Sequence, residues 1–331
     1  MRDTGSSVER FSPPSTSAQR INFVLRYAVR PLLAQLLSGL ALLEEWAPVG
    51  HRAQLWHSGA RRVLQLASAW IPSPRGVARS ALTIRGVPVE QSVPTRPSGT
   101  TVLYLHGGAF VICGPSTHRR LVGQLAQDCG ATVLAPDYRM LPQIPFTEIL
   151  DDCVNVYRQM LDDGFDPKKV VIAGDSAGGY LTLATAQALR DAGLPLPAGL
   201  VAIAPWLDLR RSLRGEDRSS EVLIPWRQAQ LVVQKLIAPL GPLALANPAD
   251  GDLAGLPPTL VQVSAAELLF RDSTYLADRL AEAGVRTRLE IWHGQIHVFQ
   301  ALPDLNPDAR RAIGNIAGFI RQVTAQTQPS A

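Results

Sequence analysis

The sequence predicts an α/β protein in which a mostly parallel sheet is covered by helices on both faces and by a helical cap. From about residue 100 onward, short apolar runs of five or six residues alternate with longer stretches of helical apolar spacing. Such alternation is typical of parallel sheets. Two regions, residues 1–75 and about 208–252, do not follow the alternation. We therefore expect them to form additions that lie over the carboxyl ends of the strands.

The composition is that of a globular protein with a substantial core. The 331 residues are 46% hydrophobic and 18% charged, which excludes global disorder. The net charge is +4 and the Lys and Arg residues are scattered, so no nucleic-acid partner is indicated. The three cysteines make neither a disulfide framework nor a zinc motif. A reducing compartment, the cytoplasm, is the expected location.

The N-terminal region, residues 1–75, is expected to comprise a disordered start followed by cap helices. The first twenty residues are polar and rich in Ser and Pro, and residues 21–46 are apolar but interrupted by charges. The uninterrupted apolar piece is too short to span a membrane, and it comes too late in the chain for a secretory signal. We expect an amphipathic helix packed on the protein. Peripheral membrane contact through Arg26 and Arg30 is an alternative.

Residues 76–331 are expected to form the catalytic domain, with a cap insertion at about 208–252. An antiparallel hairpin at 82–93 starts the sheet. Strands are then predicted at residues 101–105, 131–135, 169–173, 200–203, 259–263 and 288–292. Helices are predicted at residues 117–129, 146–161, 176–192, 273–283 and 309–325. The insertion combines a polar loop at 210–221 with an apolar helix at 228–240.

The segment Gly-Asp-Ser-Ala-Gly at 174–178 lies where an apolar strand meets a helix. A nucleophilic serine needs a tight strand–turn–helix corner, and Gly174 and Gly178 leave room for it. The start of the helix adds a positive dipole near any developing negative charge. We predict Ser176 as the nucleophile. The alternative is a glycine-rich turn in which this serine is only a helix cap.

A second glycine-rich segment, His-Gly-Gly-Ala at 106–109, follows the predicted strand at 101–105. Acyl transfer needs backbone N–H groups that converge on one oxygen, and glycines let a loop present them without side-chain clashes. We predict Gly108 and Ala109 as two donors of an oxyanion hole. Ala177, which directly follows the serine, is the third.

Several motifs together resemble the hormone-sensitive-lipase-like family of α/β-hydrolases. They are HGGAF, DYRMLPQIPF, GDSAGG, the long segment DLAGLPPTLVQVSAAELLFRDSTYLADRLAEAGV, and GQIHVF. The resemblance covers about residues 100 to 320. It implies an α/β-hydrolase fold with an eight-stranded sheet, a cap made from the N-terminus and an insertion, and hydrolysis of carboxylic esters. The substitutions at Met140, Leu141 and Gln143 depart from the family pattern without touching the chemistry.

His297 in GQIHVF is the predicted base, because it follows the strand at 288–292 and comes after the serine, as in this fold. His106 precedes the serine and is expected to be structural. His293 is the competing base. A metal site formed by His293 and His297 would need a helix between them, and Gly294 argues against one. No metal is expected.

Two carboxylates, Glu267 and Asp272, compete for the acid of the triad after the strand at 259–263. In the family the acid precedes the histidine by about thirty residues, which favours Glu267. Either carboxylate could orient the imidazole of His297 and stabilise its charged form. Asp272 could instead cap the following helix. Asp175 is not expected to be the acid, since it adjoins the nucleophile and its side chain should point elsewhere.

These residues predict a cofactor-independent ester hydrolase that works through an acyl-enzyme. An apolar pocket is expected around Phe110, Tyr180, Trp206 and Leu207. Such a lining suits small neutral esters of short to medium acids. The alternatives are a lipase for longer acyl chains at a membrane surface, an amidase or acyltransferase with the same triad, and a non-catalytic binding module. The sequence leaves a homodimer open.

Overall fold

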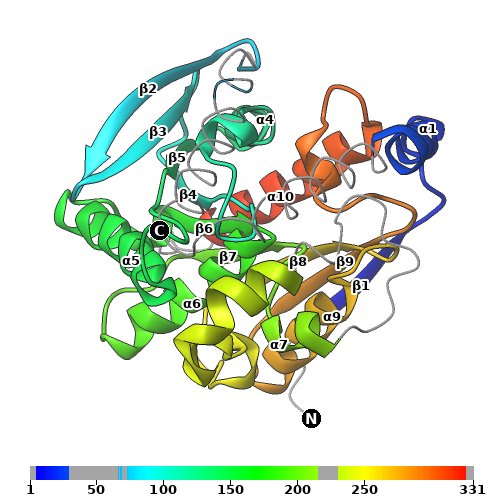
Figure 1. The fold of residues 1–331 in the computed structure, drawn as a ribbon. Coiled ribbons are helices and arrows are strands. Elements are labelled where there is room, and N and C mark those ends of the chain that lie inside the picture. Colours follow the sequence, from blue (N-terminus) through cyan, green and yellow to red (C-terminus); the bar gives the residue numbers. More distant parts are fainter. Residues whose placement is uncertain (1–4, 30–65, 67, 69–72, 215–229, 326–331) are drawn as a thin grey trace.

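A twisted central sheet organises the computed structural model, which describes residues 5–29, 66, 68, 73–214 and 230–325. Within these residues nine strands form one sheet in the order β1-β9-β8-β7-β6-β4-β5-β3-β2 (Figure 1). The strands are β1 (Ser7–Phe11), β2 (Val77–Ile84), β3 (Val87–Pro94), β4 (Thr101–Leu105), β5 (Thr132–Pro136), β6 (Val170–Asp175), β7 (Gly199–Ile203), β8 (Thr259–Ser264) and β9 (Thr287–Trp292). The pairs β2–β3 and β3–β5 are antiparallel, and the other pairs are parallel. The predicted fold class is confirmed.

The α-helices follow the strands much as the apolar spacing predicts. They are α1 (Thr16–Val24), α4 (Arg119–Cys129), α5 (Phe146–Asp162), α6 (Ala177–Asp191), α7 (Leu209–Arg214), α9 (Phe270–Glu282) and α10 (Pro307–Ala325). Shorter 3₁₀ turns lie at Pro115–His118, Pro167–Lys169, Ala238–Leu240, Pro242–Leu245, Pro248–Asp250 and Phe299–Ala301, and π-helical turns at Leu25–Val29 and Val233–Ile237.

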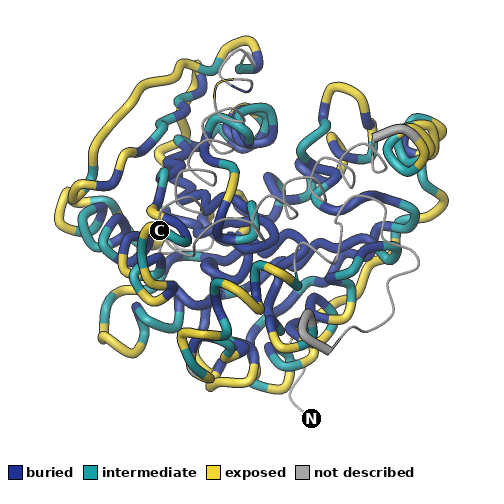
Figure 2. The backbone as a smooth tube through the Cα atoms, viewed as in Figure 1, coloured by how far each residue is buried: buried dark blue, intermediate teal, exposed yellow. Residues whose placement is uncertain are grey.

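The core consists of two apolar layers, one on each face of the sheet. Alternate residues of a strand point to opposite faces. In β4, Leu103 and Leu105 therefore join the layer beneath α5, α6 and α9, whereas Val102 and Tyr104 join the layer beneath α4 and α10. The central strands are buried along their length, while the outer strand β2 is largely exposed (Figure 2). This sandwich holds the carboxyl ends of the central strands in fixed positions.

The start of the chain differs from the expectation. Residues 7–11 were expected to be disordered, but they form β1, which pairs in parallel with β9 and adds a ninth strand to the eight expected. Phe11 stacks on Trp292 with ring centroids 4.1 Å apart and an interplanar angle of 11°. The guanidinium of Arg311 lies 4.8 Å from the centre of the Phe11 ring. The partner strand and these aromatic and cationic contacts order a segment whose own sequence is polar.

Replacing Phe11 with alanine is expected to lower the free energy of unfolding by about 2 kcal/mol, because a half-buried ring and its stack on Trp292 are lost. Urea denaturation of the variant and of wild type measures the change. Val8→Ala is the matched control, since Val8 lies on the same strand and is exposed. Equal effects of the two substitutions would contradict a structural role for the stack.

The predicted cap insertion also begins differently from the expectation. The first part of the predicted polar loop, residues 209–214, is the helix α7. Residues 215–229 lie outside the described part of the chain, as do residues 30–65 of the predicted N-terminal cap. The predicted helix at 228–240 is helical from residue 230 onward, with a π-helical turn at Val233–Ile237. Of the helices formed by described residues, none has the length and apolar character to cross a bilayer.

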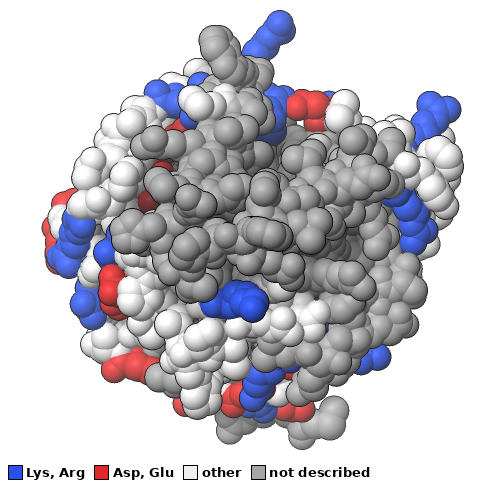
Figure 3. Space-filling view, viewed as in Figure 1, with Lys and Arg blue, Asp and Glu red and all other residues white. Residues whose placement is uncertain are grey.

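The antiparallel hairpin is present and longer than expected, since β2 and β3 extend to either side of a turn at Arg85 and Gly86. On the face seen in Figure 3, the visible Lys and Arg side chains are separated from one another, and acidic side chains lie among them. On this face, the Lys and Arg side chains are as scattered as they are along the sequence.

Candidate active site

The strand β6 ends in a sharp turn that presents Ser176 at the start of α6. Ser176 has φ 53° and ψ −118°, a conformation that L-residues rarely adopt. The turn fits only because its flanking residues lack side chains. A Cβ on Gly178 would lie 1.9 Å from the carbonyl oxygen of Leu105, and one on Gly174 would lie 2.3 Å from that of Gly178. The sequence prediction of a strand–turn–helix corner is confirmed.

Backbone hydrogen bonds hold Ser176 in this conformation. Its N–H donates to the carbonyl of Ile203 at 2.8 Å. Its carbonyl accepts N–H groups from three residues, Gly179 at 3.0 Å, Tyr180 at 3.2 Å and Trp206 at 3.0 Å. The side chain of Ser176 makes no capping hydrogen bond to α6. The hydroxyl therefore has no part in holding the turn.

The loop after β4 packs directly against the serine. A Cβ on Gly107 would lie 3.1 Å from the Cβ of Ser176. Gly108 and Ala109 both have positive φ, 123° and 53°. In the described part of the chain, the N–H groups of Gly108, Ala109 and Ala177 are not bonded to another protein group. Gly107 therefore packs against the turn, and the predicted oxyanion donors Gly108 and Ala109 follow it directly in the chain.

Asp175 anchors this loop rather than joining the triad, in line with the expectation that its side chain points elsewhere. Its carboxylate accepts the N–H of Gly107 at 3.1 Å and the hydroxyl of Tyr104 at 2.8 Å, and it pairs with the ring of His118 at 3.3 Å. Burial alone would raise the pKa of Asp175, but the charge and hydrogen bond of His118 lower it below its usual value. Burial alone would lower the pKa of His118, and Asp175 raises it.

His106 is also part of the loop's framework. Its Nδ1 lies 2.8 Å from the carbonyl oxygen of Gly107, and its ring stacks on Tyr138 with centroids 4.3 Å apart. The hydroxyl of Tyr138 donates to the carbonyl of His106. These contacts suit the structural role predicted for His106.

Glu267 and His297 meet at the carboxyl ends of β8 and β9. The Oε2 atom of Glu267 is hydrogen-bonded to Nδ1 of His297, and its Oε1 accepts the N–H of Ser264 at 2.7 Å. Glu267 is 6% exposed and His297 is 8% exposed. The N–H of Ser264 holds the carboxylate through Oε1, and Oε2 orients the imidazole through Nδ1.

The segment that carries His297 is braced from outside by the N-terminal residues. The side-chain amide of Asn22 donates to the carbonyl of Gly294. Asp308 accepts both the N–H of Ser15 at 2.9 Å and the side chain of Gln295 at 2.8 Å. Sequence reasoning missed this support, because its members are hundreds of residues apart. Deletion of residues 1–29 would therefore remove β1 together with these contacts.

Asp272 lies elsewhere in the structure. Its carboxylate accepts the N–H groups of Leu207 and Asp208, each at 2.9 Å, and the Nη1 of Arg211 at 2.8 Å. The helix α9 begins at Phe270, with Leu269 at its N-cap. The interpretation of Asp272 as a helix cap is therefore wrong.

His293, the competing candidate for the base, follows β9. Its backbone N–H donates to the carbonyl of Phe11 at 3.0 Å, beside the outer strand β1.

An aromatic cluster lies beside Ser176. Phe110 makes an edge-to-face contact with Tyr180 at 5.7 Å between centroids and is stacked on Trp206 at 6.0 Å. Leu207, the fourth predicted lining residue, is fully buried in the same apolar layer. Phe146 packs against Phe110 at 4.9 Å and was missed. Its signal was the motif DYRMLPQIPF, which ends on this residue.

Among the side chains that the structure describes, no group of three or more His, Cys, Asp and Glu residues is placed to hold an ion.

Comparisons with known proteins agree with the fold. The family described as "alpha/beta hydrolase fold" matches residues 102–301. An "Acetyl-hydrolase" of Streptomyces hygroscopicus is 40% identical over 236 residues, which cover 70% of this chain and 79% of that protein. "Esterase LipU" of Mycobacterium tuberculosis is 38% identical over 245 residues, which cover 70% of this chain and 81% of that protein.

Solved structures resemble the whole chain. The crystal structure of "an esterase from the bacterial hormone-sensitive lipase (HSL) family" has a TM-score of 0.79 and 31% identity, and the match covers 95% of this chain and 100% of that one. The esterase EstE5, in a crystal soaked with p-nitrophenyl butyrate, has a TM-score of 0.78 and 30% identity over 94% and 99% of the two chains. The chain is a carboxylesterase- or lipase-type hydrolase that belongs to the hormone-sensitive-lipase-like family of α/β-hydrolases.

Proposed function

We propose that this protein hydrolyses carboxylic esters through an acyl-enzyme on Ser176, with His297 as the general base and Glu267 as the acid that orients it. The observation that carries the proposal is the buried hydrogen bond between Glu267 and Nδ1 of His297. It leaves Nε2 as the nitrogen that can accept a proton from the Ser176 hydroxyl. All three residues follow the carboxyl ends of parallel strands, β6, β8 and β9, and these ends lie on the same side of the sheet.

In the first half of the reaction, the Ser176 oxygen attacks the ester carbonyl while His297 takes the serine proton. Glu267 stabilises the imidazolium that results. His297 then gives the proton to the departing alkoxide, and an alcohol leaves. In the second half, His297 removes a proton from water, the hydroxide attacks the acyl-enzyme, and the proton returns to Ser176 as the acid leaves.

The oxyanion of each tetrahedral intermediate is assigned to the N–H groups of Gly108, Ala109 and Ala177. These groups have no other protein acceptor in the described residues, and Asp175 holds the loop that carries two of them. Fixed donors of this kind need no reorganisation during the reaction, and each is worth about 3 kcal/mol of transition-state stabilisation.

The proposed substrates are small neutral esters of short- to medium-chain acids. The acyl group would lie against Phe110, Tyr180, Trp206 and Leu207, whose side chains are mostly apolar. The hydroxyl of Tyr180 donates to the carbonyl of Ala246 at 3.2 Å, and burial raises the pKa of Tyr180 to about 12. The name of one relative, an acetyl-hydrolase, supports a short acyl group.

A series of p-nitrophenyl esters from acetate to palmitate tests this assignment. We expect kcat/KM to peak between acetate and hexanoate and to fall about tenfold or more at longer chains, because the acyl group outgrows the aromatic cluster. The matching p-nitroanilide is the control for bond type. Equal rates on ester and anilide would contradict the esterase and favour an amidase, and a maximum at palmitate would favour a lipase.

One observation supports membrane contact as a second candidate. Phe23 and Tyr27 near the N-terminus are 64% and 65% exposed, and their rings lie 4.8 Å apart. Arg20 and Arg26 lie on the same segment. Aromatic rings beside cationic side chains are typical of helices that bind anionic lipid surfaces.

Sedimentation with vesicles of anionic and of neutral phospholipid tests this contact. We expect binding to anionic vesicles only, and its loss in the double variant Phe23→Ser/Tyr27→Ser. Exchanging Val8, an exposed apolar residue outside the segment, for serine is the control. Equal binding of wild type and the double variant would remove this candidate.

We place the protein in the cytoplasm, a location supported by the buried thiols of Cys129 and Cys153.

A further inference from the structure

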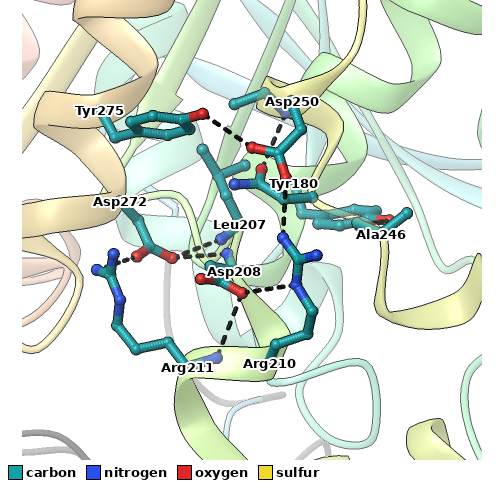
Figure 4. Close-up of polar contacts among 11 residues, drawn as sticks. Tyr180, Leu207, Asp208, Arg210, Arg211, Ala246, Asp250, Asp272 and Tyr275 are labelled. Carbon is teal, nitrogen blue, oxygen red and sulfur yellow. Dashed lines mark hydrogen bonds and ion pairs between the residues drawn. The ribbon is translucent and has the colours of Figure 1, made fainter. Parts of the chain in front are cut away.

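Polar contacts tie together the two ends of the cap insertion (Figure 4). Asp208 stands at the start of the insertion and Asp250 near its end. Arg210 bridges them, with its Nε 3.3 Å from Asp208 and its Nη2 2.8 Å from Asp250. Both ends are also bound to the helix α9. Asp272 accepts the N–H of Asp208, and the hydroxyl of Tyr275, one turn further along, donates to Asp250 at 2.9 Å.

The ion pair of Arg210 with Asp250 and that of Arg211 with Asp272 differ in burial, and burial determines how strongly each holds the insertion in place. The side chains of Arg210 and Asp250 are each nearly half exposed, so solvent screens their pairing and it contributes little. The carboxylate of Asp272 is only 3% exposed. It accepts two backbone N–H groups and the guanidinium of Arg211. Removing such a buried acceptor leaves its donors unsatisfied, so Asp272 is the dominant tie.

Asp272 is linked to the nucleophile through one short segment. It holds the N–H of Leu207, and the preceding residue, Trp206, donates its own N–H to the carbonyl of Ser176 at 3.0 Å. Trp206 and Leu207 are two of the proposed acyl-contact residues. The same carboxylate pairs with Arg211 of α7, the first turn of the cap insertion. One side chain therefore binds both the segment of Trp206 and Leu207 and the first turn of the cap insertion.

We propose that Asp272 is a positioning residue that fixes Trp206, Leu207 and the first turn of the cap insertion beside Ser176, and thereby sets the acyl-chain preference. This rests on the proposed esterase function. Asp272 takes no part in the chemistry, because its oxygens are occupied by Leu207, Asp208 and Arg211. Burial raises the pKa of Asp272 to about 6, so the group remains charged at neutral pH despite its desolvation.

The test compares kcat and KM of wild type and Asp272→Asn on p-nitrophenyl acetate, butyrate and hexanoate. An asparagine oxygen can still accept the two N–H groups, but the ion pair with Arg211 is lost. We expect KM for hexanoate to rise about tenfold, KM for acetate to rise about twofold, and kcat to fall less than threefold on each ester. A purely structural defect would lower the active fraction equally for all three esters.

Asp278→Asn is the matched control, because it makes the same chemical change at an exposed position of α9. It should leave all three KM values unchanged. Arg211→Gln serves if Asp272→Asn does not fold, and it should give the same graded rise in KM. A ratio of hexanoate to acetate KM that stays at the wild-type value in the folded variant would overturn the proposal. An equal loss of kcat by several orders of magnitude on every ester would also overturn it. If wild type hydrolyses none of these esters, the proposed function fails instead.

Discussion

Replacing Ser176 with alanine is expected to abolish ester hydrolysis and leave the fold intact. The proposed nucleophile is the side-chain hydroxyl, and its loss should lower kcat by about 10⁵-fold or more. The turn is held by the N–H and the carbonyl of residue 176, which alanine retains, and the hydroxyl makes no cap to α6. Alanine also has the same backbone restrictions as serine at φ 53°, so the strain of the turn is unchanged.

Initial rates on p-nitrophenyl butyrate and the thermal midpoint of unfolding measure the two parts of this result. The midpoint should move by less than about 2 °C, which corresponds to about 1 kcal/mol for a chain of this length. Ser80→Ala removes a hydroxyl from the exposed strand β2 and is the control, with activity expected to remain. If a folded Ser176→Ala protein keeps most of its turnover, the acyl-enzyme mechanism is wrong.

The second large effect is expected for Glu267→Gln, with a loss of about 10⁴-fold in kcat. Glutamine presents either an amide oxygen or an NH₂ group to His297. It cannot supply the negative charge that stabilises the imidazolium, and the NH₂ group would favour the wrong tautomer. The N–H of Ser264, which Glu267 accepts at 2.7 Å, can still bond to the amide oxygen, so the protein should fold.

Asp272→Asn is the comparison variant, because the relative loss of kcat in the two variants shows which carboxylate acts as the acid. The two carboxylates are five residues apart in the sequence, both are buried, and both were candidates for the acid. Measured side by side on p-nitrophenyl acetate, Glu267→Gln should lose kcat by at least a thousandfold more than Asp272→Asn. The reverse ranking would transfer the acid role to Asp272, against the hydrogen bond seen between Glu267 and His297.

Much of the fold could be predicted because its signals are local. The strands β4, β6, β7 and β8 appear in the sequence as apolar runs that are buried on both faces, and each is followed by a turn and a helix. The glycines around Ser176 are likewise a local signal. Their positions follow from backbone contacts within the turn and with the neighbouring strand, which tolerate no side chain.

The edge strand β1 could not be predicted, for the opposite reason. Its sequence, Ser-Val-Glu-Arg-Phe, is largely exposed in the structure and carries only Val8 and Phe11 as apolar residues. Its hydrogen-bonding partner, β9, lies about 280 residues further along the chain. The ring of Trp292 that covers Phe11 is equally distant. Neither contact can be predicted from the local spacing of apolar residues.

The start of α9 could not be predicted from the sequence either, although the helix itself was predicted. Asp272 looks like a cap in the sequence, but the helix begins at Phe270 and the side chain of Asp272 is buried. Asp272 binds backbone N–H groups after β7 instead of those of its own helix. A carboxylate serves either donor set equally well, so only the packing of α9 against that loop selects one.

Local patterns in the sequence suffice to predict the α/β class, the corner that carries Ser176, the loop with Gly108 and Ala109, and the position of His297 after the last predicted strand. These depend on glycine spacing and on apolar runs, which act over a few residues. Three contacts emerge only from the folded chain: Glu267 meets His297, Asp272 binds the segment of Trp206 and Leu207, and the N-terminal strand pairs with β9. Such contacts join side chains that are distant in sequence, and their hydrogen-bonding partners are set by the packing of whole strands and helices.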